Sequence, residues 1–304
     1  MIDFQHIIDT IAKEANTAEE RGKVASYIPE LSKVSAKKFG ITLLDADGNS
    51  FSAGDSNERF SIQSISKVLA LAKAFDLEGD HLWQRVGVEP SGDPFNHLSL
   101  LEMENGIPRN PLINAGAIVI CDILVSKLNA PKQDFLTFVQ QIANDPTITY
   151  DEAVAQSEKK TGFKNYAAAY LIKSYGNLTN DVETVLDLYF YMCSLTLSCE
   201  QLVKVFYIFM NHGKCLRNQH YLNIFQIKRI NAIMLTCGFY DEAGEFAFEV
   251  GLPGKSGVGG GIVALLPNEF CVATWSPGLN DKGNSKLGMR ALEKLTTKTG
   301  LSIF

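Results

Sequence analysis

The chain has 304 residues, of which 46% are hydrophobic and 20% are charged, and its formal net charge at pH 7 is −6. These values are typical of a soluble globular protein that can bury a large core as one domain or two lobes. The mild negative charge argues against an extended nucleic-acid-binding surface.

The chain also lacks the usual features of secreted and membrane proteins. Residues 1–6 show no basic segment followed by an apolar run, so we expect no secretory signal. No apolar stretch reaches the roughly 18 residues that span a bilayer. The six cysteines include no CxxC pair, and a chain of this length needs no disulfides to fold. We therefore expect a cytoplasmic protein with free thiols and no membrane contact.

The first third of the chain predicts a helix, a hairpin and a second helix. Apolar residues recur at helical spacing over residues 3–20. Residues 38–53 predict a β-hairpin, and residues 66–77 predict a strongly apolar helix. Residues 79–113 carry Gly, Pro and Asn at short intervals, which predicts a loop with one short helix around 98–104.

The middle of the chain, over residues 114–212, is helical almost throughout. The predicted helices span residues 115–128, 131–143, 150–161, 165–175, 181–193 and 199–211. Residues 223–236 predict one more helix.

The last quarter of the chain returns to short strands. Strands are predicted at residues 246–250, 260–266 and 270–275, and a final helix at 287–299. This order predicts an α+β fold, in which strands from both ends form one antiparallel sheet flanked by helices, with an all-helical subdomain inserted. We expect a single domain of 304 residues. Its α/β lobe would span approximately 1–63 and 215–304, and its helical lobe approximately 64–214.

Two short motifs point to acyl-transfer chemistry. Ser64 and Lys67 have S-x-x-K spacing, and Lys255-Ser256-Gly257 lies near the end of the chain, directly before a glycine-rich segment that ends at Gly261. In this order the motifs indicate a serine nucleophile activated by a lysine, with a late strand closing the site.

Local context selects these copies among several. S-x-x-K also occurs at 35–38 and 157–160, and Lys-Thr-Gly occurs at 160–162 and 298–300. Only Ser64 opens a convincing apolar helix directly after a loop. There residues three apart share a face, and helix N–H groups suit a developing oxyanion. On spacing alone a simpler interpretation stays open, in which Ser64 is an N-cap and Lys67 lies on a solvated face.

A lysine acts as a base only when it is neutral. We therefore expect burial or a neighbouring cation to lower the pKa of Lys67, and a tyrosine to relay the proton. Tyr27, Tyr189 and Tyr240 are candidates for this relay. The histidines are His6, His81, His97, His212 and His220. Their spacing fits neither a metal site nor a catalytic triad, so we expect no metal and no cofactor.

Seven segments, in order along nearly the whole chain, carry a more specific signal. They are Val24–Pro29, Phe60–Lys67, Glu89–Gly92, Asn110–Ala117, Ser157–Glu158, Thr236–Asp241 and Gly251–Gly261. In this order the segments resemble the bacterial-type glutaminases, serine-dependent relatives of β-lactamases and penicillin-binding proteins.

The resemblance implies a β-lactamase-like fold and a glutaminase (EC 3.5.1.2), which hydrolyses L-glutamine to L-glutamate and ammonia. Ser64 would attack the side-chain carboxamide, Lys67 would be the general base, and Tyr240 or Tyr189 would share the proton traffic. The backbone N–H groups of Ser64 and Val258 would hold the oxyanion. The resemblance also implies a homodimer or homotetramer that needs no cofactor.

The same resemblance places the substrate contacts. They fall on Tyr27, Ser64, Asn114, Glu158, Asn165, Tyr189, Tyr240 and the main chain of Val258. Glu158 supplies the anion that the α-ammonium of free glutamine requires, whereas the amides and tyrosines supply donors for its α-carboxylate. Two alternatives remain: a β-lactam- or peptide-directed serine acyl hydrolase, and a non-catalytic glutamine-binding protein.

Overall fold

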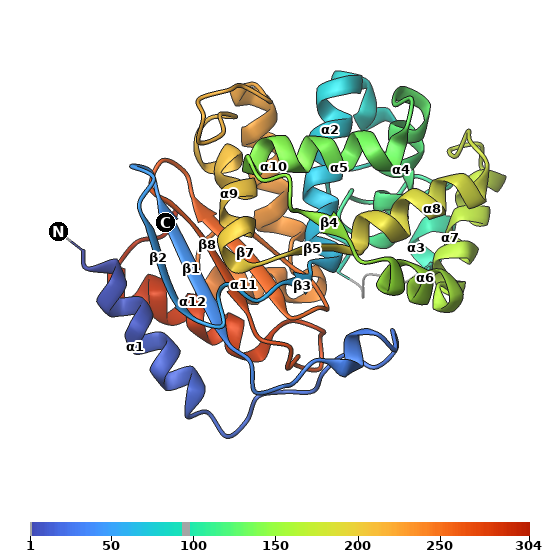
Figure 1. Cartoon of the computed structure of the whole chain (residues 1–304). Helices are drawn as coiled ribbons and strands as arrows, with labels where there is room; N and C mark the ends of the chain where they lie inside the picture. The colour runs from blue at the N-terminus through green and yellow to red at the C-terminus, as the bar shows by residue number, and fades with distance from the viewer. Residues whose placement is uncertain (1, 93–97) are drawn as a thin grey trace.

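The fold is built around a five-stranded antiparallel sheet whose strands come from both ends of the chain (Figure 1). The computed structural model describes residues 2–92 and 98–304. The strands of this sheet are β1 (Gly40–Asp45), β2 (Ser50–Gly54), β6 (Gly254–Ser256), β7 (Gly261–Leu266) and β8 (Phe270–Trp275). Their order is β2-β1-β8-β7-β6, and Leu43 of β1 lies opposite Val272 of β8. The predicted α+β fold with one antiparallel sheet is confirmed.

Both faces of the sheet are covered, so β7 and β8 are buried along their full length. Successive side chains of a strand point to opposite faces, and here they supply two different cores. Ile262 and Ala264 belong to the core on one face, whereas Val263 and Leu265 belong to the core on the other.

Three helices cover the first face: α1 (Phe4–Asn16), α11 (Ala243–Glu249) and α12 (Lys286–Thr299). Helix α1 begins where the Asp3 side chain accepts a hydrogen bond from the His6 N–H at 3.0 Å. Such a cap satisfies one of the N–H groups that a helix start leaves unpaired. Ile8 and Ile11 then point into the core beneath the helix.

The remaining α-helices gather on the opposite face and beyond the end of the sheet (Figure 1). They are α2 (Ser66–Glu78), α3 (Ser99–Met103), α4 (Asn114–Lys127), α5 (Pro131–Ala143), α6 (Glu152–Thr161), α7 (Phe163–Ser174), α8 (Val182–Cys193), α9 (Cys199–Met210) and α10 (Ile224–Cys237). Helices α2 and α4 are buried on nearly all sides, which explains why their sequences are apolar without a clear polar face. No helix among the described residues is long and apolar enough to cross a membrane.

A second, small sheet joins the helical part to the large sheet. Its strands are β3 (Phe60–Ser61), β5 (Leu195–Leu197) and β4 (Thr149–Tyr150), in the order β3-β5-β4. The sequence did not predict these strands, because segments of two or three residues carry no periodic signal. Strands β4 and β5 lie within residues 64–214, so the expectation that this inserted part is all-helical is wrong. The short helix expected near 98–104 is α3, and residues 93–97 of the expected loop lie outside the described residues.

The prediction of a strand at residues 246–250 is wrong, because residues 246–249 belong to helix α11 and Val250 is its C-cap. Its apolar residues alternate in sequence and therefore imitate a strand. In the structure Ala243, Phe246 and Val250 are buried while Phe248 is exposed, which is the spacing of a helix face. Phe246 stacks on Phe239 with 3.6 Å between ring centroids.

Candidate active site

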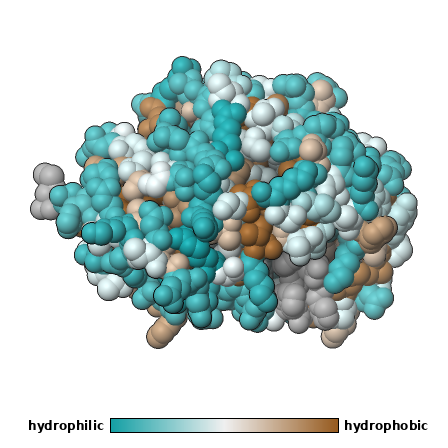
Figure 2. All heavy atoms as spheres, turned by 60° about the horizontal axis from the view of Figure 1, so that its bottom comes forward, coloured by the Kyte–Doolittle hydropathy of each residue, from teal (hydrophilic) through white to brown (hydrophobic). Residues whose placement is uncertain are grey.

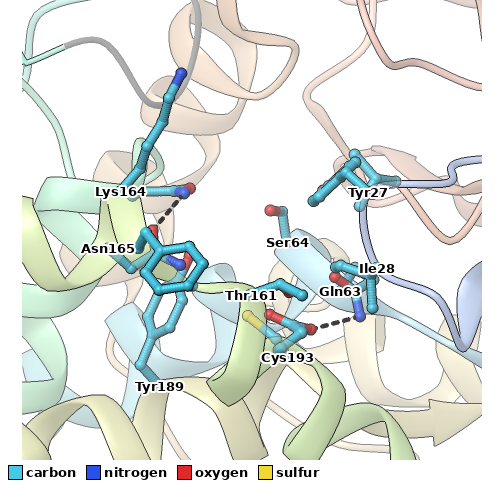
Figure 3. A pocket seen from close by; sticks show the side chains of 14 residues that line it. Tyr27, Ile28, Gln63, Ser64, Thr161, Lys164, Asn165, Tyr189 and Cys193 are labelled. Atoms are coloured by element: carbon cyan, nitrogen blue, oxygen red, sulfur yellow. Dashed lines mark hydrogen bonds between the residues drawn. The ribbon is translucent and has the colours of Figure 1, made fainter.

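A pocket of about 360 Å³ lies where the helices meet the turn before α2 (Figure 3). It is lined by Tyr27, Ile28, Gln63, Ser64, Asn114, Glu158, Thr161, Gly162, Phe163, Lys164, Asn165, Tyr189, Cys193 and Val258. Every residue that the resemblance singled out for substrate binding lies on this wall except Tyr240, which is buried behind Ser64.

Ser64 lies in a one-turn 3₁₀ helix, Gln63–Ile65, directly before α2. The expectation that Ser64 itself opens the α-helix is therefore off by two residues, and its simple N-cap role is not observed, since Ile65 occupies the N-cap position. Gln63 has φ of 51°, a left-handed conformation that is uncommon outside glycine. The Ser66 hydroxyl closes the turn by donating to the Gln63 carbonyl at 2.7 Å.

The glycine-rich segment after β6 packs directly on this turn. A Cβ at Gly257 would lie 2.4 Å from the Ile62 carbonyl oxygen, and one at Gly259 would lie 2.1 Å from that of Ser61. Only residues without a side chain allow this approach. The Trp275 indole N–H donates to the Gly259 carbonyl at 3.1 Å and holds the loop from below. Val258 is thereby fixed on the pocket wall beside Ser64.

Lys67 is buried, with only 1% of its surface exposed, so the solvated-face interpretation is wrong. Its ammonium donates to Asn114 Oδ1 at 2.6 Å and to the Leu112 carbonyl at 3.3 Å. Among the described residues no carboxylate forms an ion pair with it. Burial lowers the pKa of Lys67 to about 8, although the nearby charge of Glu158 opposes part of this shift.

Tyr240 lies between two buried lysines. Its ring centroid is 4.1 Å from Lys255 Nζ and 5.7 Å from Lys67 Nζ. Burial raises the pKa of Tyr240, and a hydrogen bond with Ser64 opposes that rise. Burial and the neighbouring charge of Lys67 lower the pKa of Lys255. Of the three candidate tyrosines, Tyr240 is therefore the one with a contact to Ser64. Its backbone is left-handed like that of Gln63, with φ of 57°.

The pocket wall also carries the groups expected to bind an amino acid. Glu158 is 6% exposed, and burial raises the pKa of its carboxyl to about 7. Asn114 Nδ2 donates to Asn165 Oδ1 at 2.9 Å, which links these two amides to Lys67. Tyr189 is buried on α8, whereas Tyr27 is 54% exposed on an N-terminal segment over the pocket (Figure 3).

Several wall residues were not foreseen. Gln63 had a signal, since it precedes the proposed nucleophile, and Cys193 follows Tyr189 by one helical turn and thus shares its face. Ile28 lies in the segment Val24–Pro29 that carries the resemblance, whereas residues 161–164 had no signal of their own. In the described part of the chain no cluster of three or more His, Cys, Asp or Glu is arranged to hold a metal ion. His97 lies outside the described residues.

Comparison with known proteins gives a consistent result. Residues 22–304 match the protein family described as Glutaminase. The chain is 58% identical to the glutaminase of Christiangramia forsetii, and the match covers 100% of both chains. It is 51% identical to the glutaminase of Yersinia pestis strain Nepal516, over 98% of this chain and 97% of that one.

Solved structures agree with these sequence matches. The probable glutaminase ybaS has a TM-score of 0.92 at 34% identity, covering 100% of this chain and 99% of that one. A probable glutaminase of Bacillus subtilis has a TM-score of 0.87 at 31% identity, covering 99% and 97%. Mglu in its glutamate form has a TM-score of 0.93 at 29% identity, covering 100% and 70%. These likenesses favour a glutaminase over the two alternatives, a β-lactam- or peptide-directed hydrolase and a non-catalytic glutamine-binding protein. The chain belongs to the glutaminase family (EC 3.5.1.2), enzymes that hydrolyse L-glutamine to L-glutamate and ammonia.

Proposed function

We propose that the pocket hydrolyses glutamine through an acyl-enzyme on Ser64, with Lys67 as general base. The observation that carries this proposal is a buried lysine that forms no ion pair with a carboxylate of the described residues and lies one helical turn after a serine that contacts Tyr240. Because the pKa of Lys67 is about 8, about a tenth of these side chains are neutral at pH 7. That fraction suffices for a general base operating near neutral pH.

In the first half-reaction Ser64 Oγ forms a bond to the side-chain carbonyl carbon of glutamine. Its proton passes to the Lys67 amine, with Tyr240 as the relay. The same proton then reaches the amide nitrogen as the C–N bond breaks, so ammonia leaves. In the second half-reaction water attacks the ester carbonyl, and Ser64 recovers its proton as glutamate departs.

The tetrahedral intermediates carry negative charge on the former carbonyl oxygen. We propose that the backbone N–H groups of Ser64 and Val258 bind this oxygen, because the glycines on either side of Val258 allow its backbone to lie beside the serine turn. Fixed donors at this position stabilise the intermediate more than the substrate, which accelerates the reaction.

The α-ammonium of glutamine is proposed to bind Glu158. Its α-carboxylate is proposed to bind the amides of Asn114 and Asn165, with Tyr27 and Tyr189 closing the pocket. The pocket volume of about 360 Å³ suits a single amino acid. A related protein, Mglu, has been solved in its glutamate form, and glutamate is the product of this proposed reaction.

Replacement of Ser64 by alanine tests the mechanism. Ser64→Ala is expected to lower ammonia release by about 10⁴-fold or more, because the covalent route is lost. Ser35→Ala is the matched control, since it removes the serine of another S-x-x-K copy at an exposed position. An electrophilic glutamine analogue should add its mass to Ser64 in the parent protein and not in Ser64→Ala. Near-parental activity of a folded Ser64→Ala protein would refute the mechanism.

We also propose a β-lactamase-like fold, in which an α/β lobe (1–63 and 215–304) carries a helical lobe (64–214). The serine turn at the junction of the sheet and the helices supports this. A homodimer or homotetramer is supported by exposed apolar side chains such as Phe163, which is 78% exposed. Figure 2 shows apolar groups gathered near the centre and along an edge of an otherwise hydrophilic face. A reducing, cytoplasmic setting is supported by six buried free cysteines.

A further inference from the structure

Gln63 is a wall residue of the pocket for which the proposed mechanism has no task. It directly precedes Ser64, and its side chain is buried under the glycine-rich loop, with its Cβ 3.4 Å from the position of a Cβ at Gly257. Its left-handed backbone costs free energy, and such conformations persist where the surrounding structure holds them in place.

The Gln63 amide makes two hydrogen bonds whose direction is fixed by chemistry. Nε2 donates to Glu158 Oε1 at 2.8 Å and to Ser61 Oγ at 2.9 Å (Figure 3). The Ser61 hydroxyl in turn donates to the Cys193 carbonyl at 3.0 Å, so it faces Gln63 with a lone pair. Because both partners accept, the amide nitrogen and not the amide oxygen must point toward Glu158.

This arrangement holds Glu158 as a carboxylate and in one orientation. A donated N–H stabilises the ionised form of a buried acid, against the burial that disfavours it. It also anchors Oε1, while Oε2 carries no hydrogen bond from the described part of the chain. The second oxygen therefore stays available on the pocket wall for a donor of the substrate.

We propose that Gln63 is a positioning residue that makes the enzyme selective for substrates with a free α-ammonium group. It acts through Glu158, by fixing one carboxylate oxygen so that the other receives the ammonium. This inference rests on the proposed role of Glu158. It gives Gln63 a part in the preference for γ-carboxamides that carry a free α-ammonium over analogues without the amine.

The experiment compares glutamine with 4-carbamoylbutanoate, which is glutamine without its α-amine. Steady-state kinetics are measured for the parent protein, Gln63→Asn, Glu158→Gln and Ser61→Ala. Asparagine tolerates the left-handed backbone but is one methylene too short to reach Glu158. Gln63→Asn is expected to raise KM for glutamine about 10- to 100-fold, the cost of a hydrogen bond to a charged group, with a smaller change in kcat. Its preference for glutamine over 4-carbamoylbutanoate falls by the same factor.

The control variants distinguish the role of Gln63 from the role of Glu158. Ser61→Ala disturbs the same turn but keeps the bond between Gln63 and Glu158, so most of the preference should survive. If Glu158→Gln lowers the preference while folded Gln63→Asn keeps it, the inference is overturned and the proposed ammonium site stands. If Glu158→Gln keeps the preference, the proposed site fails and the inference fails with it. If Gln63→Asn lowers kcat alone, with KM and the preference for glutamine unchanged, then Gln63 only maintains the shape of the serine turn. That result also overturns the inference.

Discussion

At the scale of single residues, the site depends on ionisable groups that are buried away from their usual surroundings. Burial lowers the pKa of Lys67 to about 8 and raises that of Glu158 to about 7. The two pKa values move in opposite directions for the same reason, since burial favours the uncharged form of each group, and both values come close to neutral pH. For Lys67 the neutral amine that burial favours is the form that its proposed task needs. For Glu158 the task needs the carboxylate, which the hydrogen bond from Gln63 and the charge of Lys67 favour against burial.

The pH dependence of catalysis follows from these two groups. As pH falls below about 7, Glu158 takes up a proton and loses its attraction for the α-ammonium, so KM for glutamine should rise about tenfold per pH unit. As pH rises toward about 8, the neutral fraction of Lys67 grows, so kcat should increase and then level off. Initial rates over glutamine concentration series between about pH 5 and 9 measure both limbs.

Glu158→Gln serves as the control for the acid limb, because glutamine at this position does not titrate. Its KM should be high at every pH and show no acid limb. A KM that stays constant in the parent protein from about pH 7 to 5 would contradict the assignment of Glu158.

At the scale of elements, the sequence predicted most helices within a few residues, since long segments with apolar residues at helical spacing, such as α1 and α5, leave little doubt. It also predicted the hairpin β1–β2 and the pair β7–β8. It failed where the local pattern was short or ambiguous. The strands β3, β4 and β5 are too short to show a period, and α11 imitates a strand because its phenylalanines alternate.

The glycine loop gives a prediction at this scale. In Gly259→Ala the new Cβ would lie only 2.1 Å from the Ser61 carbonyl oxygen. The loop must therefore move away from the serine turn. A displacement of catalytic groups by about 1 Å can cost about 10²-fold in rate, and we expect kcat/KM to fall by that order. Kinetics together with thermal unfolding measure the effect.

Gly244→Ala is the matched control for this substitution. Gly244 lies in α11, where a Cβ would meet no other atom within 4 Å, and alanine there favours the helix by about 0.5–1 kcal/mol. We expect unchanged kinetics and an equal or higher Tm. If Gly259→Ala behaves in the same way, the loop does not position the site.

At the scale of the whole molecule, the active site is assembled from segments far apart in the chain. Ser64, Glu158 and Tyr240 come from different elements, and nothing in their spacing brings them together. The sequence therefore identified Glu158 only through the family resemblance, whereas a local motif indicated Ser64, and Tyr240 was one of three candidate tyrosines. It missed Gln63, because its task depends on a hydrogen bond to a residue 95 positions away.

The helical part is held together by a buried carboxylate that has no part in the proposed chemistry. Asp122 on α4 is fully buried and accepts hydrogen bonds from Arg85 at 2.7 Å and from the backbone N–H of Asn180 at 2.8 Å. Arg85 also donates to the side chain and carbonyl of Asn177. These bonds tie the segment after α2 and the segment before α8 to the central helix.

Loss of this carboxylate should therefore destabilise the whole fold. Burial alone would raise the pKa of Asp122, but the hydrogen bonds from Arg85, Asn180 and Thr179 outweigh it, so the pKa is lowered. A lowered pKa means that the stabilisation is present above the unfolded pKa of about 3.9 and is lost as pH falls through the folded value. Asp122→Ala leaves Arg85 without its carboxylate partner and should lower the free energy of unfolding at pH 7 by about 3 kcal/mol. This value is toward the low end for buried pairs, because Arg85 retains some contact with water. Denaturant unfolding at pH 7 and near pH 3 measures the effect, and the difference in stability between the parent protein and the variant should shrink at the lower pH. Asp80→Ala, which removes a 72% exposed partner of Arg229, should cost less than about 1 kcal/mol. Equal losses in the two variants would show that Asp122 does not join these segments.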